Sequence, residues 1–574
     1  MPHNAAHLML EMLAEFGVQH LFGNPGTTEM PLMDALMDDA CARRIRYVLG
    51  LQEVPVVAAA DGYAQASGSL GVVNLHISCG LGNAMGMLYN AWSAGTPLLI
   101  TAGQQHRKLL FSDPVLAGDM VSVAKPWTKW ASEVNRVEDL PTALRRAIQT
   151  ALTPPTGPTF LSLPIDLQAE LTEISALPPN VPDVKSVPPS SSISAAAELL
   201  LTAENSLILA GSRALECGAT DETVRLAELA GAAVLVDPPS SHGRMGFPCD
   251  HPLFAGWLSH DARAAHERLS QHDVVLAVGI ELLRTYLYFD DTSAVPESVR
   301  LIQIDDNPNR LGKNFVPELA VLGHPQPTLA SIATHIQENA TQQFNFAAMQ
   351  RKERLARKHE DLRSELRAEI SRQAAGETAE SMSHQTNISP FALMGAIANV
   401  LPTDVAVIEE AATTTSAILQ RLGAIQRPDG YFGHRGWALG WGLGCAVGVS
   451  LAWPQRPVLA ILGDGGALYG IQGLWTAARE NLPVTFLIAN NRSYEILKHG
   501  ARALELPNAR ENRFVGLDLN DPEIDYLALS QSFGVPAVRA KSLDDVRDLL
   551  TDSFAARSPR LIEVLITESA HGPR

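Results

Sequence analysis

Runs of apolar residues alternate along this chain with helical patterns of apolar and polar residues. In the first part, an apolar run at residues 72–76 is followed by a Gly-rich turn and a helical pattern, and another run occupies 98–101. Strands that alternate with helices in this way are typical of parallel sheets in α/β domains. We therefore expect an α/β domain at residues 1–175.

A Pro- and Ser-rich stretch at 177–194, typical of an exposed linker, precedes a second block of α/β pattern. Apolar runs at 206–210, 234–236, 274–278 and 301–304 predict its buried strands, and we place this domain at 190–340. Residues 350–373 are rich in Arg, Lys and Glu and predict a solvated linker helix. The third domain, at 385–574, has strand patterns at 458–462, 484–489 and 561–567. The sequence therefore predicts three doubly wound parallel-sheet domains.

The composition indicates a globular protein without a nucleic-acid or membrane partner. The chain has 574 residues, of which 46% are hydrophobic and 18% charged, and its formal net charge is −18. This negative charge disfavours nucleic acids and membrane surfaces, and no apolar run reaches the ~18–20 residues that span a bilayer. The five cysteines show no CxxC spacing, and no basic leader precedes the first helical pattern. We expect a soluble, cytoplasmic protein.

The third domain carries candidate ligands at the ends of two neighbouring strands. Asp464 follows the run at 458–462, and Asn491 follows the run at 484–489. Because parallel strands of one βαβ unit end at the same sheet edge, we expect these two side chains to converge. A carboxylate, an amide oxygen and a main-chain carbonyl suit an octahedral Mg²⁺ site. Glycines let the backbone approach phosphates, and those beside Asp464 are Gly463, Gly465 and Gly466.

Gly-Asp-Gly or Asn-Asn alone commonly forms only a turn or a loop. Their combination and spacing here resemble the thiamine-diphosphate signature, which runs from GDG to NN. By that resemblance, Asp464, Asn491 and the carbonyl of Ser493 bind the metal ion beside the diphosphate. A competing dinucleotide site, built on the glycines of residues 440–444, lacks the GxGxxG spacing.

Thiamine diphosphate requires a carboxylic acid that donates a proton to its aminopyrimidine ring. A carboxyl group in an apolar wall suits this role, because burial disfavours the anion. Glu53 is the candidate, since it follows an apolar run at 46–51 and opens a helical pattern with an apolar face. The alternative is that Glu53 is only a favourable dipole partner at the start of a helix.

Further motifs resemble the thiamine-diphosphate-dependent 2-oxo acid decarboxylases, and the benzoylformate decarboxylases in particular. The motifs lie at residues 23–29, 51–53, 60–66, 74–76, 82–86, 101–105, 413–417, 419–422 and 474–478. The resemblance implies a pyrimidine-binding, a middle and a diphosphate-binding domain. It also implies a homo-oligomer, a dimer at least and usually a tetramer, because the first domain of one subunit faces the third domain of its neighbour.

The same resemblance assigns residues to the cofactor. It makes Glu53 the activator of the ring, Thr413 a diphosphate contact, and Leu439 the bulky residue that holds the cofactor in its bent conformation. Tyr494, just beyond the metal loop, and Trp437 are the remaining expected cofactor contacts.

Substrate chemistry is assigned to His76 and to the hydroxyl group of Thr27. His76 ends the strand pattern at 72–76, where such sheet edges host ligands, although an isolated His is more often structural. Thr27 stands where the relatives carry a serine, so it keeps the hydroxyl group and adds a methyl group.

The second catalytic histidine of the family has no counterpart in this chain. Tyr286 stands at its position, with Tyr288 as the nearest alternative. A tyrosine is a poorer proton shuttle, because its ordinary pKa is about 10. The acid–base work is then open to His106 or His434.

Charged residues at 495–499 and Arg435 lie near the expected pocket, where the family's aromatic lining is partly missing. They suggest a polar or doubly charged substrate, although a charged run is usually solvated surface. Trp437 and Trp441 offer an aromatic wall, and core packing explains them equally well.

The sequence therefore predicts the non-oxidative decarboxylation of a benzoylformate-like 2-oxo acid to an aldehyde and CO₂, with thiamine diphosphate and Mg²⁺. The first alternative is a carboligase that resembles acetolactate synthase, although an FAD-binding middle domain is not evident. A lyase or hydrolase that acts on another carbonyl substrate is the second alternative. A cofactor-binding homologue without turnover is a further one, against which the presence of Glu53, Asp464 and Asn491 argues.

Overall fold

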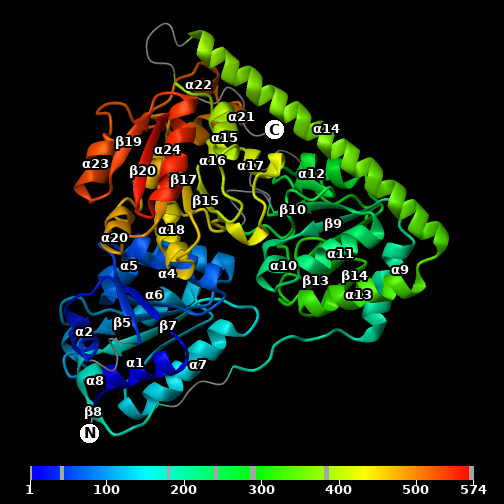
Figure 1. Cartoon of the computed structure of the whole chain (residues 1–574). Helices are drawn as coiled ribbons and strands as arrows, with labels where there is room; N and C mark the ends of the chain where they lie inside the picture. Colours follow the sequence, from blue (N-terminus) through cyan, green and yellow to red (C-terminus); the bar gives the residue numbers. More distant parts are fainter. Residues whose placement is uncertain are drawn as a thin grey trace. The chain divides into compact units, whose positions relative to one another are not determined.

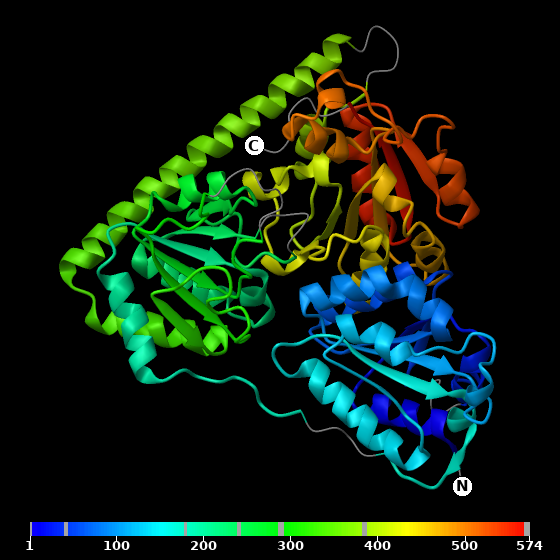
Figure 2. The same cartoon turned by 180° about the vertical axis from the view of Figure 1, so that it is seen from behind.

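The computed structural model describes residues 3–38, 44–176, 181–237, 243–284, 292–380 and 387–567. The chain forms two compact units. The first comprises Met1–Asp183, His434–Lys541 and Leu549–Leu565, and the second comprises Val184–Gly433, Ser542–Asp548 and Ile566–Arg574. The described residues form three parallel sheets of six strands each. Figures 1 and 2 show helices flanking these sheets. The predicted α/β fold with three doubly wound parallel sheets is confirmed.

The first sheet belongs to the first unit and has the order β3-β2-β4-β5-β7-β6, with parallel neighbours throughout. Its strands are β2 (His20–Gly23), β3 (Arg46–Leu49), β4 (Gly71–Leu75), β5 (Leu98–Gln104), β6 (Trp130–Glu133) and β7 (Thr159–Pro164). The helices α4 (Glu53–Ser67) and α5 (Ile77–Ala94) cover one face, and α1 (Ala5–Glu15) and α7 (Leu140–Leu152) cover the other (Figure 1). Leu8, Leu144 and Leu161 belong to the core on the α1 and α7 side.

The second sheet belongs to the second unit and has the order β11-β10-β9-β12-β13-β14, again parallel throughout. Its strands are β9 (Ser206–Ala210), β10 (Ala233–Val236), β11 (Phe254–Trp257), β12 (Val274–Val278), β13 (Arg300–Asp305) and β14 (Leu319–Leu322). Its helices include α9 (Ser190–Leu201), α11 (Thr220–Ala230), α12 (Ala262–Leu269) and α13 (Pro325–Asn339). This strand order is that of a doubly wound nucleotide-binding fold.

Both predicted linkers need correction. The exposed linker expected at 177–194 is shorter, because α9 already begins at Ser190, directly after Pro189. The predicted linker helix is part of the long helix α14 (Gln342–Glu380), which Figure 2 shows as one continuous element. One stripe of α14 is packed rather than solvated: Arg351 donates to the carbonyl of Ala230, and His359 is buried against the carbonyl of Pro252.

The third sheet contains β17 (Val458–Gly463), β18 (Val484–Asn490), β20 (Arg560–Leu565) and β19 (Ala537–Ala540), which lie in this order in the first unit. The parallel pair β15 (Ala406–Glu410) and β16 (Tyr431–Gly433) lies in the second unit. Helices beside these strands include α16 (Ala412–Thr415), α18 (Trp441–Ala452), α20 (Gly473–Arg479), α21 (Glu495–Ala503) and α23 (Tyr526–Ser532). Among the described helices, none combines the length and the apolar content that crossing a membrane would need.

Small residues let α18 pack closely on α4 within the first unit. A Cβ atom added to Gly444 would lie 2.5 Å from the carbonyl oxygen of Pro55, and one added to Gly448 would lie 1.9 Å from that of Ala59. These glycines therefore serve helix packing, which removes the sequence argument for a dinucleotide site at residues 440–444. The contact also fixes α4, whose first residue is Glu53.

Candidate cofactor site

Asp464 and Asn491 leave two adjacent strands at the same edge of the third sheet. The register pairs Gly463 at the end of β17 with Ala489 near the end of β18. Asp464 directly follows Gly463, and Asn491 follows the last residue of β18. The parallel strands therefore bring the two predicted ligands to one edge.

Asp464 is a buried carboxylate with one uncompensated oxygen. Burial raises its pKa to about 6, although the backbone amides of Gly465, Arg492 and Ser493 act in the opposite direction. Its Oδ2 atom has no hydrogen-bond partner among the described residues. A buried anionic oxygen without a donor is costly, and a cation bound there would remove the cost. Asp464 thus fits a role as metal ligand.

The Asn491 loop presents further oxygen atoms at this edge. Asn491 Oδ1 accepts a hydrogen bond from the backbone N–H of Ser493 at 3.0 Å, which closes the loop into a tight turn. An amide oxygen has two lone pairs, so Asn491 can still bind a cation. Tyr494 packs against Gly465, since a Cβ atom there would lie 2.4 Å from the Tyr494 ring. The glycine is therefore needed for close packing of the two loops.

Two residues that were not predicted from the sequence stabilise the loops at Asp464 and Asn491 by hydrogen bonds. The hydroxyl group of Tyr526 donates to the carbonyl of Asp464 at 2.9 Å. Asn490 donates to the buried carboxylate of Glu563 at 2.7 Å, and its own oxygen accepts from the N–H of Arg492. Asn490 was visible in the Asn-Asn motif, whereas Tyr526 lies far along the chain and gave no signal.

Glu53 opens α4 and its side chain is buried. Asn24 donates to Glu53 Oε1 at 3.1 Å, and Asn83 donates to Oε2 at 3.0 Å. A Cβ atom added to Gly80 would lie 3.3 Å from Glu53 Oε1 and 3.3 Å from the Cβ atom of His76. Glu53 and His76 thus both lie close to Gly80.

His76 is oriented by Glu29, which the sequence analysis passed over although it ends the motif at 23–29. His76 Nδ1 lies 2.9 Å from Glu29 Oε2, and the Glu29 side chain is completely buried. Gly26 lies against the ring, because a Cβ atom there would be 2.1 Å from His76 Nδ1. Thr27 is exposed, and the neighbouring hydroxyl group of Thr28 is the one that bonds to Glu29.

The other predicted acid–base groups lie in contrasting surroundings. His106 is partly exposed, with its Nδ1 atom 3.8 Å from Asp166. His434 is buried, which lowers its pKa to about 4, and its Nδ1 atom has no hydrogen-bond partner in the described part of the chain. Tyr286 and Tyr288 lie outside the described residues.

The remaining cofactor candidates belong to both units. Trp437 and Leu439 precede α18 in the first unit, with 37% and 40% of their surfaces exposed. Thr413 lies on the short helix α16 in the second unit, where it is half-buried.

The charged residues of α21 pair with one another and with Asp518. Glu495 is buried, and its Oε1 atom lies 3.0 Å from His499 Nε2 and 3.0 Å from Arg502 Nη1. Lys498, also buried, donates to Asp518 at 2.7 Å. The charges at 495–499 that suggested a polar substrate are therefore engaged in ion pairs within this part of the protein.

The exposed face at the start of α21 is apolar instead. Ile496 and Leu497 have 42% and 51% of their surfaces exposed and directly follow Tyr494 and Glu495. A Cβ atom added to Gly500, one turn later, would meet no atom within 4 Å. An apolar face with free space thus begins at the Asn491 loop.

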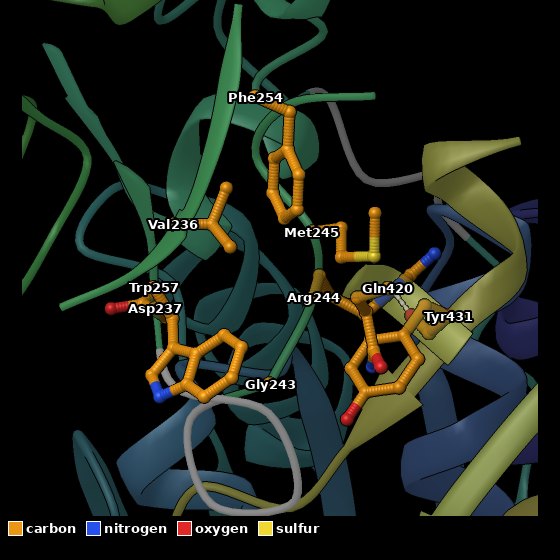
Figure 3. A pocket seen from close by; sticks show the side chains of 9 residues that line it. All are labelled: Val236, Asp237, Gly243, Arg244, Met245, Phe254, Trp257, Gln420 and Tyr431. Atoms are coloured by element: carbon orange, nitrogen blue, oxygen red, sulfur yellow. Dashed lines mark hydrogen bonds between the residues drawn. The ribbon is translucent and has the colours of Figure 1, made fainter. Parts of the chain in front are cut away.

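The second unit has a small pocket at the ends of β10 and β11 (Figure 3). Its polar lining includes Asp237, Arg244 and Gln420. The Cζ atom of Arg244 lies 3.8 Å from the centroid of the Phe432 ring, and its side chain donates to the carbonyl of Tyr431. Tyr286 and Tyr288 lie outside the described residues, and none of the other predicted catalytic, cofactor-binding or metal-binding residues lines this pocket.

Three family models match the chain. Residues 3–113 match the N-terminal TPP binding domain of thiamine pyrophosphate enzymes, residues 193–332 match their central domain, and residues 411–564 match their C-terminal TPP binding domain. The terminal matches include Glu53 and His76 in one case and Asp464 and Asn491 in the other.

Individual relatives match along almost the whole chain. Benzoylformate decarboxylase from Pseudomonas aeruginosa is 33% identical over 565 residues, which cover 98% of both chains. A probable acetolactate synthase large subunit from Methanocaldococcus jannaschii is 26% identical, over 98% of this chain and 91% of its own. The crystal structure of benzoylformate decarboxylase from Polynucleobacter necessarius superimposes with a TM-score of 0.85 at 28% identity, covering 99% of this chain and 100% of the other.

Proposed function

This chain belongs to the thiamine pyrophosphate enzymes, and on that premise we propose that it decarboxylates a benzoylformate-like 2-oxo acid without oxidation, releasing an aldehyde. It is a thiamine-diphosphate-dependent carboxy-lyase of the group that contains decarboxylases and acetolactate synthases. The observation that carries the proposal is the placement of a buried Glu53 beside a histidine that Glu29 holds in position.

Bound thiamine diphosphate supplies a carbon nucleophile and an electron sink for the carboxylate that is lost. Glu53 is the carboxyl group that would exchange a proton with the pyrimidine ring. Asn24 and Asn83 fix its two oxygens, and its burial shields it from water. Asp464 Oδ2, Asn491 Oδ1 and the carbonyl of Ser493 would hold Mg²⁺, which in turn would hold the diphosphate.

His76 is the acid–base group next to the substrate in this proposal. The carboxylate of Glu29 faces Nδ1 and keeps a proton on it, so Nε2 is the nitrogen that accepts or donates a proton. Thr27, which precedes Glu29 closely in the sequence, is exposed. Its hydroxyl group is a second donor for the substrate in this proposal. Tyr286, His106 and His434 remain predictions for the second acid–base role, and the burial of His434 makes it the least accessible of the described pair.

We propose that the substrate has an apolar acyl group and carries no charge other than that of its 2-oxo acid carboxylate. Lys498 and His499 already bind acidic groups, so they are not free to bind a second carboxylate. Ile496 and Leu497 instead present apolar surface directly after the Asn491 loop. An aromatic or branched acyl group gains most from such a surface.

A carboligase is the second candidate, favoured by the match to a probable acetolactate synthase over 98% of this chain. In that case the acyl group that remains after loss of CO₂ would be transferred to a second carbonyl compound instead of being released as an aldehyde. For either reaction we propose a homo-oligomer in the cytoplasm, a dimer at least and a tetramer as the usual assembly.

The proposal is tested by incubating the enzyme with Mg²⁺ and thiamine diphosphate and a panel of 2-oxo acids, while CO₂ and carbonyl products are measured. Benzoylformate and related aryl acids should give CO₂ and an equal amount of aldehyde. A dicarboxylic 2-oxo acid should react far more slowly. A hydroxyketone in place of the aldehyde would favour the carboligase, and no CO₂ from any acid would overturn the proposal.

A further inference from the structure

Asn90 on α5 holds the backbone of Ala438, a residue 348 positions further along the chain. Its Nδ2 atom donates to the carbonyl of Ala438 at 2.8 Å, and its Oδ1 atom accepts from the N–H of the same residue at 3.1 Å. Asn90 is itself buried. One side-chain amide thus pairs with both polar groups of a single residue, as a neighbouring strand would.

The surroundings show that this pairing is built into α5. A Cβ atom added to Gly436 would lie 2.3 Å from Asn90 Oδ1, so the chain passes directly over the amide. A Cβ atom on Gly86, one turn before Asn90, would lie 3.5 Å from the Cβ atom of Ala438. Arg435 donates to the carbonyl of Ala94 at the end of α5. Residues 434–440 are therefore fastened to α5 at several points.

The two neighbours of Ala438 are exposed apolar residues on a constrained backbone. Trp437 has a φ of +64°, a conformation that is strained for a bulky residue. Gly440, with a φ of +92°, fits only as glycine, because a Cβ atom there would lie 2.7 Å from the Tyr469 backbone. Leu439 lies between these two points and keeps 40% of its surface exposed. Fixing Ala438 therefore fixes the direction of Leu439.

We propose that Asn90 is a positioning residue for the cofactor: by clamping Ala438 it holds Leu439 in place against thiamine diphosphate. This inference rests on the proposed function, in which Leu439 contacts the cofactor. Asn90 touches neither cofactor nor substrate and acts through the backbone. Strain at Trp437 would otherwise relax by turning the segment, and the two hydrogen bonds prevent this.

The test compares Asn90→Ala with Asn90→Asp, Leu439→Ala and the double variant Asn90→Ala/Leu439→Ala. Amide hydrogen exchange of residues 434–440, cofactor affinity and kcat are measured for each. Thr159→Val is the matched control, because it removes a buried hydrogen-bonding group of the same sheet domain at a distance from this segment. Asn90→Asp keeps the acceptor for the N–H of Ala438 and loses the donor, so it reports on the clamp if Asn90→Ala does not fold.

Asn90→Ala should speed exchange at Ala438 by at least about tenfold and weaken cofactor binding by about tenfold. In the Leu439→Ala background the same change should leave cofactor affinity unaltered within about twofold, because the clamp acts through Leu439. Unchanged exchange and affinity in Asn90→Ala, or effects that multiply in the double variant, would overturn the inference.

The exchange and binding measurements separate this inference from the proposed reaction. If no 2-oxo acid releases CO₂ but Asn90→Ala still loosens the segment and weakens cofactor binding through Leu439, the clamp stands and the reaction is wrong. If the wild-type enzyme decarboxylates and Asn90→Ala changes neither exchange nor affinity, the reaction stands and the clamp is wrong.

Discussion

A buried Glu29 and a half-buried His76 form an acid–imidazole pair, with Glu29 Oε2 at 2.9 Å from His76 Nδ1. The same carboxylate accepts hydrogen bonds from the backbone N–H groups of Gly26 and Gly103 and from the hydroxyl group of Thr28. With three donors besides the imidazole, the carboxylate is fixed in place. It therefore sets both the orientation of the ring and the position of its proton.

Glu29→Gln should lower kcat about 100-fold while cofactor affinity stays nearly constant. The donors around Glu29 share two carboxylate oxygens, whereas a glutamine offers them only one. The NH₂ group of the glutamine would also point a proton at His76 Nδ1, which then competes with the proton on the ring. The ring then loses its fixed tautomer, which should also change the pH profile of kcat. Steady-state kinetics between pH 5 and pH 9 measure both effects.

Glu133→Gln is the control for this variant, since Glu133 also accepts side-chain hydrogen bonds in the same sheet but does not contact His76. It should retain its pH profile and most of its kcat. Equal losses in both variants would mean that Glu29 serves only the stability of the sheet.

Glu53→Gln should abolish turnover and spare cofactor binding. The amide keeps the size of the side chain and can still interact with Asn24 and Asn83, but it has no acidic proton for the pyrimidine ring. CO₂ release measures turnover, and titration with thiamine diphosphate measures binding. A variant with full activity would remove Glu53 from its assigned role.

Removal of divalent metal should weaken cofactor binding by at least about tenfold, because the diphosphate then faces the carboxylate of Asp464 without a bridging cation. Titration calorimetry after treatment with a chelator checks this. Mg²⁺ should restore the affinity, whereas K⁺ at the same ionic strength should not. Tight binding in chelator-treated enzyme would contradict the placement of a metal at Asp464.

The strands of this fold were predictable because their apolar runs are local. The run at 274–278 coincides with β12, and the run at 206–210 coincides with β9, since both strands are buried on both faces. The linkers were predicted less well. Serines after Pro189 suit the first turn of a helix as well as a loop, and only the packing of α9 decides between them.

Site residues were predictable where a motif marks them and not where distant segments meet. Asp464 and Asn491 end strands of one βαβ unit, so their placement follows from the order of elements. The Asn90–Ala438 clamp joins residues far apart in the chain and leaves no local pattern. The ion pairs of Glu495 could have been predicted from the sequence, because Lys498, His499 and Arg502 follow it at helical spacing on one face.

Gly448→Ala should destabilise the protein by about 3 kcal/mol, because the added methyl group would lie 1.9 Å from the carbonyl oxygen of Ala59. Gly82 on α5 is the matched control, since a Cβ atom there meets nothing within 4 Å. Gly82→Ala should be neutral or stabilise by up to about 1 kcal/mol. Denaturant unfolding measures both variants, and equal stabilities would show that α4 and α18 are not closely packed.

The buried His434 should make the protein lose stability in mild acid. Burial lowers its pKa from 6.5 to about 4 in the folded chain, so between these values the unfolded chain binds the extra proton. This contribution to the free energy of unfolding is therefore complete above pH 6.5 and is lost as the pH falls toward 4, by about 3 kcal/mol in total. His434→Leu cannot take up that proton, and its unfolding free energy should fall less over the same interval, as urea unfolding at pH 7, 5.5 and 4.5 would measure. The same pH dependence in both proteins would place the titrating group elsewhere, with His20, whose pKa burial also lowers to about 4, as the next residue to replace.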